Sequence, residues 1–203
     1  MGFYRLIDDN QAQIALWKIT ESEEELKDLT GLDLSNMYTY PRRRIETMVV
    51  RAMLNHLDHF EAVNYHPNGR PYYSDGTPHI SISHSAHMVV VAFSQLLSIG
   101  VDIERANRDF RAVANRYLSV NELKWINLDN QKSLALAWCI KESVYKLPWK
   151  VSKNFTTDIC MQQFSNPDES GVVIVDVVDQ NETHRLKLKY LFFDEYCLSW
   201  ACI

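Results

Sequence analysis

The sequence predicts an α+β protein of two similar lobes, each with strands that pair antiparallel and helices beside them. Two observations lead to this fold class. Both halves of the chain combine segments of helical periodicity with strand pairs. The chain has 203 residues and is 46% hydrophobic, which is enough for an ordinary globular core. We place the boundary near residues 95–99, which gives a first lobe of residues 1–97 and a second lobe of residues 98–203.

The first lobe contains both kinds of periodicity. Strand side chains alternate between two faces, whereas apolar residues on one helix face recur every three or four positions. A capping box from Thr20 to Glu23 is predicted to open an acidic helix, and a longer helix follows Pro41. The expected elements are a strand over residues 13–20, helices over 21–29 and 41–60, a loop over 64–78, and strands over 79–83 and 88–94.

The second lobe begins with a strand and ends with a run of strands. Between them, three segments show helical spacing, and the second of these opens on a capping box from Ser119 to Glu122. The expected elements are a strand over residues 99–104, helices over 109–118, 120–128 and 131–147, and strands over 157–164, 172–178, 186–193 and 196–201.

The composition excludes several classes of protein. A net charge of −5 disfavours a general nucleic-acid binder, which would show a basic excess. The longest apolar run, Met88–Phe93, is too short to cross a bilayer, and the N-terminus lacks the long apolar segment of a signal peptide. The four cysteines have neither CxxC nor metal-ligand spacing, so we expect free thiols and a cytoplasmic location.

One predicted strand, Gly100-Val101-Asp102-Ile103-Glu104, carries two carboxylates. Because successive strand side chains point to opposite faces, Asp102 and Glu104 lie side by side on one face. A half-solvated strand would show the same alternation, so this segment alone does not establish a site. Gly100 permits close backbone approach, which favours a functional role.

The predicted helix that follows supplies a third carboxylate, Glu142, and two lysines, Lys141 and Lys146. These charges sit in a mostly apolar helix, where unpaired charge is costly. An internal ion pair between Glu142 and Lys146 is the structural alternative. Together with Asp102 and Glu104, however, Glu142 can share a hard divalent cation, and the lysines can hold a phosphate that the cation bridges. This combination indicates phosphate-transfer chemistry.

Three further segments are candidate anion sites. Gly69-Arg70-Pro71 offers a guanidinium fork, and Ser83-His84-Ser85 offers hydroxyls, a ring N–H and backbone N–H groups. The basic run Arg42-Arg43-Arg44 lies at a helix start, where positive charge opposes the helix dipole. The alternatives are a loop cation, a hairpin turn and a solvated helix start.

Glu122 has two interpretations of equal weight. It occupies the N3 position of the capping box, which is a structural role, or it has a functional role. Asp102 followed by Glu122-Leu123-Lys124 also mimics the D…ExK site of a metal-dependent nuclease. The helical spacing of this segment and the acidic balance of the chain argue against that reading.

Four motifs occur in order along the chain: G-R-P at residues 69–71, I-S-H-S at 82–85, G-V-D-I-E at 100–104 and W-x-x-K-E-S-x-x-K at 138–146. This arrangement resembles the 4′-phosphopantetheinyl transferases of the surfactin-synthetase-activating type, over about Pro41 to Lys146. The resemblance implies a monomeric pseudo-dimer of two α+β lobes, with coenzyme A and Mg²⁺ in the cleft between them. It also implies transfer of the phosphopantetheine arm to a serine of an apo acyl or peptidyl carrier protein, with release of adenosine 3′,5′-bisphosphate. Such carriers serve fatty-acid, polyketide or nonribosomal-peptide synthesis.

The resemblance also implies roles for individual residues. The Mg²⁺ ligands would be Asp102, Glu104 and Glu142. The nucleotide and phosphate contacts would be Arg70, Ser83, His84, Lys141 and Lys146, with Arg42 and Arg43 corresponding more loosely. Either Glu122 or Glu142 would take the proton from the carrier serine. A non-catalytic module that binds coenzyme A or the carrier protein is the alternative of another class.

Overall fold

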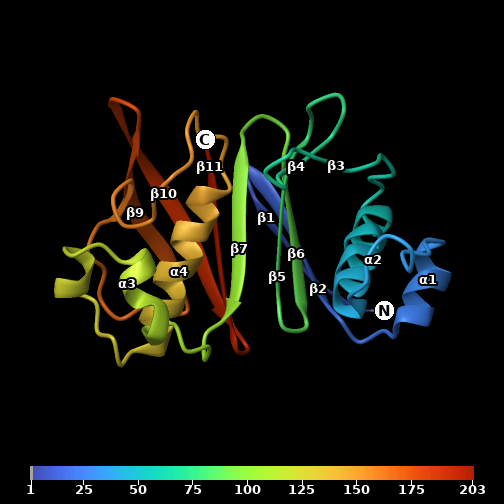
Figure 1. Ribbon diagram of the computed structural model, residues 1–203, viewed down its shortest axis with the longest axis horizontal. Helices are drawn as coiled ribbons and strands as arrows, with labels where there is room; N and C mark the ends of the chain where they lie inside the picture. The colour runs from blue at the N-terminus through green and yellow to red at the C-terminus, as the bar shows by residue number, and fades with distance from the viewer. Residues whose placement is uncertain (1) are drawn as a thin grey trace. The chain divides into compact units, whose positions relative to one another are not determined.

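The computed structural model describes residues 2–203 and divides into two compact units, one ending at Leu96 and the other spanning Leu97–Ile203. Each unit combines an antiparallel sheet with helices (Figure 1). The predicted α+β class is therefore confirmed. None of the helices in the described part of the chain is both long and apolar enough to cross a membrane.

The first unit is built on a four-stranded sheet of order β1-β2-β6-β5. Its strands are β1 (Phe3–Asp9), β2 (Ala12–Lys18), β5 (His79–Ser85) and β6 (Met88–Ser94). Its helices are α1 (Glu23–Thr30) and α2 (Pro41–His56), and a small ribbon is formed by β3 (Asn64–Tyr65) and β4 (Pro71–Tyr72). Apolar side chains of α2 pack with those of β2, β5 and β6 in one buried cluster.

Three features of the first unit differ from the sequence prediction. The capping box of α1 uses Ser22 and Glu25 instead of Thr20 and Glu23. Strand β1 was not predicted, because it is an edge strand whose side chains are exposed or half-buried and so lack a clear apolar alternation. The short strands β3 and β4 lie within the predicted loop, since two-residue strands leave no periodic pattern.

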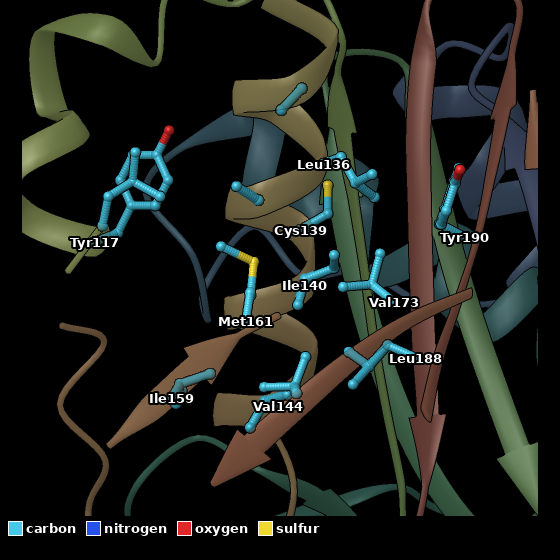
Figure 2. Packing of buried hydrophobic residues seen from close by; sticks show 14 of the residues in the cluster. Tyr117, Leu136, Cys139, Ile140, Val144, Ile159, Met161, Val173, Leu188 and Tyr190 are labelled. Carbon is cyan, nitrogen blue, oxygen red and sulfur yellow. The ribbon is translucent and has the colours of Figure 1, made fainter. Parts of the chain in front are cut away.

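The second unit is built on a five-stranded sheet of order β7-β11-β10-β9-β8. The strands are β7 (Ile99–Arg105), β8 (Ile159–Met161), β9 (Ser170–Asp179), β10 (Glu182–Phe193) and β11 (Tyr196–Cys202). Helix α4 (Gln131–Tyr145) packs against this sheet, and its apolar side chains meet those of β9 and β10 in the core (Figure 2). The remaining helical elements are η1 (Arg111–Val113), α3 (Ala114–Tyr117) and η2 (Glu122–Lys124).

The contact between α4 and β7 depends on Gly100. A Cβ atom at this position would overlap the carbonyl oxygen of Ser143 on α4. Glycine therefore allows the helix backbone to lie directly against the strand. Because side chains alternate along β7, Asp102 and Glu104 lie on the same face as Gly100, the face that α4 covers.

The two short helices predicted between β7 and α4 are only partly formed. The segment 109–118 contains η1 and α3, and the segment 120–128 contains only the single turn η2. In the second segment Glu122 is 2% exposed and uses its carboxylate to bind distant parts of the chain. Tertiary contacts therefore hold this segment, and a regular helix does not continue beyond one turn.

Candidate functional site

The acidic strand face of the second unit meets Lys146, the C-cap residue of α4. Asp102 is 5% exposed, and its Oδ1 accepts a hydrogen bond of 2.8 Å from Lys146 Nζ. The same ammonium donates to the carbonyl oxygen of Val101 at 2.8 Å. Lys146 thus forms its ion pair with Asp102, 44 residues away in the chain, and not with Glu142 of the helix that Lys146 caps.

Glu104 and Glu142 belong to the same electrostatic cluster. Burial raises the pKa of Glu142 to about 7, and the charges of Asp102 and Glu104 add to this effect, while Lys146 opposes it. Within the described residues the Glu142 carboxylate makes no hydrogen bond or ion pair. Glu104 pairs with Arg108, whose guanidinium lies over the ring of Trp138 at 5.8 Å.

The predicted metal ligands do not form a ready-made metal site. Across residues 2–203, no three His, Cys, Asp or Glu side chains are arranged to hold a metal ion. Two of the three carboxylates are instead engaged by Lys146 and Arg108. The chemistry of the donor set nevertheless fits a hard divalent cation, because all three groups are carboxylates and their mutual repulsion is what such a cation would relieve.

Lys141 lies in the core of the second unit. It is 0% exposed, and its ammonium donates three hydrogen bonds: to Glu122 Oε2 at 2.7 Å, to the carbonyl of Phe155 at 2.6 Å and to that of Ile159 at 2.7 Å. Burial lowers the pKa of Lys141, and the charge of Glu122 opposes that shift. All three N–H donors are used, so we assign Lys141 to the fold and not to the phosphate contacts predicted for it.

Glu122 is held by the same buried network. Its capping box with Ser119 forms as predicted, with Ser119 N donating to Oε2 at 2.7 Å and Glu122 N donating to Ser119 Oγ at 3.2 Å. Its Oε1 accepts a hydrogen bond from Met161 N at 2.8 Å. Both carboxylate oxygens are engaged away from solvent. This geometry favours the structural interpretation over a catalytic base, and it also removes Glu122 from a nuclease-like D…ExK site.

In the first unit, two of the predicted cationic residues gather around His84 of β5. Arg43 Nη1 lies 3.4 Å from His84 Nε2, and His84 Nδ1 lies 3.2 Å from Oε1 of Glu46 on α2. Arg42 Nε donates to the same Glu46 oxygen at 2.8 Å. The structure thus brings Arg42, Arg43 and His84 together around one buried carboxylate.

Arg44 and Ser83, which adjoin Arg43 and His84 in the chain, have other positions. Arg44 makes a two-pronged pair with Glu23 of α1 and donates to the carbonyl of Tyr38, so it ties α2 to the segment before it. Ser83 is buried and, as the neighbour of His84 in a strand, points to the opposite face of the sheet. The side chains of Ser83 and His84 therefore do not converge on one ligand group.

Arg70 lines a pocket of about 380 Å³ in the first unit. Burial lowers the pKa of its guanidinium, which nevertheless stays charged at neutral pH. Tyr73 also lines the pocket; its hydroxyl is buried, makes no hydrogen bond within the described residues, and has a pKa raised by burial to about 12. Asp75 also lines the pocket, so its polar groups include a carboxylate beside the Arg70 guanidinium and the Tyr73 hydroxyl. The guanidinium is the group of this lining that would attract an anionic ligand.

Sequence reasoning missed three residues of these clusters: Glu46, Tyr73 and Arg108. Glu46 had a detectable signal, because it shares a helix face with Val49 and Met53, where a charge needs a partner. Tyr73 and Arg108 had none, since each is marked only by contacts that the fold creates.

The comparison with protein families identifies the second unit. The model of the ACPS family, described as the 4′-phosphopantetheinyl transferase superfamily, matches residues 98–201. The matched span includes β7 and α4, and with them Asp102, Glu104, Glu142 and Lys146. No curated protein matches the chain.

Proposed function

Because this chain belongs to the 4′-phosphopantetheinyl transferase superfamily, we propose that it transfers the phosphopantetheine arm of coenzyme A to a serine of an apo carrier protein. The other product is adenosine 3′,5′-bisphosphate. The observation that carries the proposal is the match over residues 98–201, within which a buried face of β7 and α4 gathers three carboxylates and a lysine. The motifs over residues 69–146 support the surfactin-synthetase-activating type.

The reaction needs charge compensation and alignment more than covalent help from the protein. We propose that Lys146 compensates charge on the pyrophosphate of coenzyme A. Asp102, Glu104 and Glu142 would hold Mg²⁺, which when bound would neutralise developing charge on the leaving phosphate. The pair between Lys146 and Asp102 keeps the ammonium oriented toward this face.

Glu142 is the residue we propose as the base for the carrier serine. Its carboxylate makes no hydrogen bond or ion pair within the described residues, so an oxygen of it can accept a proton. Glu122 is unsuited to this role because both of its oxygens are bound within the core. The serine hydroxyl would give its proton to a Glu142 oxygen as its own oxygen attacks the phosphorus.

The first unit would bind the nucleotide end of coenzyme A. Arg43 and His84 form a basic group at α2 and β5, and Arg70 supplies a second cation in a pocket. These groups suit the 3′-phosphate and the adenosine. We further propose a cytoplasmic location, because all four cysteines are free, as is usual in a reducing compartment.

The test is direct. The protein is incubated with coenzyme A, Mg²⁺ and a panel of apo carriers from fatty-acid, polyketide and nonribosomal-peptide synthases, and the intact mass of each carrier is measured. At least one carrier should gain the mass of the phosphopantetheine arm, and a carrier with its acceptor serine changed to alanine should not. Binding of coenzyme A or carrier without any mass gain would support a non-catalytic binding module instead.

A further inference from the structure

A buried carboxylate lies inside the basic cluster of the first unit. Glu46 is 5% exposed and sits on α2, one turn after Arg42. Its Oε1 accepts from Arg42 Nε at 2.8 Å and lies 3.2 Å from His84 Nδ1. The opposite ring nitrogen of His84, Nε2, lies 3.4 Å from Arg43 Nη1. A negative group among residues suited to binding an anion requires an explanation.

The donors and acceptors in this chain determine where the His84 proton lies. Glu46 Oε1 lies 3.2 Å from His84 Nδ1, and an ionised carboxylate attracts an N–H and repels a ring lone pair, so we infer that Nδ1 carries a hydrogen. A guanidinium only donates, so Nε2 is the acceptor facing Arg43. Glu46 therefore selects one tautomer of the neutral ring and fixes the orientation of its outer nitrogen.

We propose that Glu46 is a positioning residue that holds His84 so that Nε2 and the Arg43 guanidinium together receive an anionic group, such as a phosphate. The identity of that anion rests on the proposed function. When a phosphate meets Nε2, the ring takes up a proton from solvent and donates from both nitrogens, one to the ligand and one to Glu46. The buried negative charge of Glu46 stabilises this imidazolium, and Arg43 is released to pair with the ligand.

The charged side chains of α2 that lie beside His84 are Arg43 and Glu46, and Glu46 in turn binds Arg42. The partner of His84 on the neighbouring strand β6 is the uncharged Val89. Glu46 is therefore the group of α2 that can orient the ring and favour its charged form.

Two substitutions separate these effects. Glu46→Gln keeps an oxygen that accepts from Nδ1 but removes the charge, whereas Glu46→Met fills similar space and removes both. Glu23→Gln is the matched control. Glu23, on α1, pairs with Arg44, which lies on α2 like Glu46, so this substitution also removes the carboxylate partner of an α2 arginine but does not touch His84. His84→Gln identifies the His84 signals in ¹⁵N NMR spectra.

The first measurement is the tautomer of His84 in the ligand-free protein. The wild type, Glu23→Gln and Glu46→Gln should show a hydrogen on Nδ1, and Glu46→Met should shift toward a hydrogen on Nε2. An unchanged tautomer in folded Glu46→Met would overturn the proposal. Because this measurement needs no ligand, its outcome does not depend on whether the proposed function is correct. If Glu46→Met does not fold, a wild-type ring with its hydrogen on Nε2 overturns the proposal by itself.

The second measurement is the affinity for adenosine 3′,5′-bisphosphate. We expect Glu46→Gln and Glu46→Met to bind about tenfold more weakly than the wild type, the scale of one lost charge-assisted interaction. Wild-type affinity in both would overturn the proposal. Absence of binding to the wild type, with the tautomers as expected, would instead refute the proposed function and leave Glu46 confirmed as the residue that orients His84.

Discussion

The substitution Glu142→Gln should make the protein more stable in the absence of divalent cations, by an amount that depends on pH. Burial, with the nearby charges of Asp102 and Glu104, raises the pKa of Glu142 from an ordinary value of 4.5 to about 7. A raised pKa means that the folded state binds this proton more tightly than the unfolded state. The resulting stabilisation is fully present below about pH 4.5 and is lost as pH rises through about 7.

The magnitude follows from the two pKa values. Each pH unit between them changes the free energy of unfolding by about 1.4 kcal/mol. Relative to a group that stays neutral, the Glu142 carboxyl therefore destabilises the fold by roughly 3 kcal/mol at pH 8 and by about 1.4 kcal/mol at pH 5.5. Glutamine has nearly the same shape as glutamic acid and carries no charge at either pH. Glu142→Gln should therefore exceed the wild type in stability by roughly these amounts.

The assay is urea denaturation with EDTA present, followed by tryptophan fluorescence. Four of the five tryptophans lie in the second unit, so the signal reports mainly on the part that contains Glu142. The matched control is Glu169→Gln, which makes the same substitution at an exposed position of the second unit. A gap for Glu142→Gln that is equal at pH 5.5 and pH 8, or a wild type that is the more stable at pH 8, would refute the reasoning.

Three further outcomes are expected. Asp102→Asn should lower phosphopantetheine transfer by a factor on the order of 10² or more, since Lys146 loses its charged partner and the proposed Mg²⁺ loses a ligand. Near-normal transfer by a folded variant in the carrier mass assay would rule this out. Glu122→Gln should cost about 3 kcal/mol of stability in urea denaturation, because Lys141 stays buried without its counter-charge. The transfer rate of the folded fraction should stay unchanged. A large loss of transfer rate without a loss of stability would instead assign Glu122 a catalytic role. Arg70→Ala should weaken binding of coenzyme A more than that of dephospho-coenzyme A in calorimetry, whereas an equal loss for both would place Arg70 away from the 3′-phosphate.

Local pattern alone was sufficient for the fold class and for the acidic strand. The alternation in residues 100–104 predicted that Asp102 and Glu104 share a face, and the observed strand β7 has them there. The apolar run before Lys141 predicted a buried helix, which is α4. These features depend on patterns that repeat every two residues in a strand or every 3.6 in a helix, so residues close together in the chain are enough to reveal them.

The roles of the charged residues were decided by tertiary structure. In the sequence, Glu122 fits both a structural and a catalytic role, and Lys141 is expected to contact a phosphate. Burial of both side chains, with partners at Phe155, Ile159 and Met161, favours the structural role. The pKa and the partner of a charged side chain depend on segments that come close to it only when the chain folds. The pairing of Lys146 with Asp102 and that of Glu46 with His84 likewise join residues far apart in the sequence. The sequence by itself determined which chemical groups this protein has and on which elements they lie, and folding decided which of them are engaged in the core and which lie together in the clusters proposed to bind ligands.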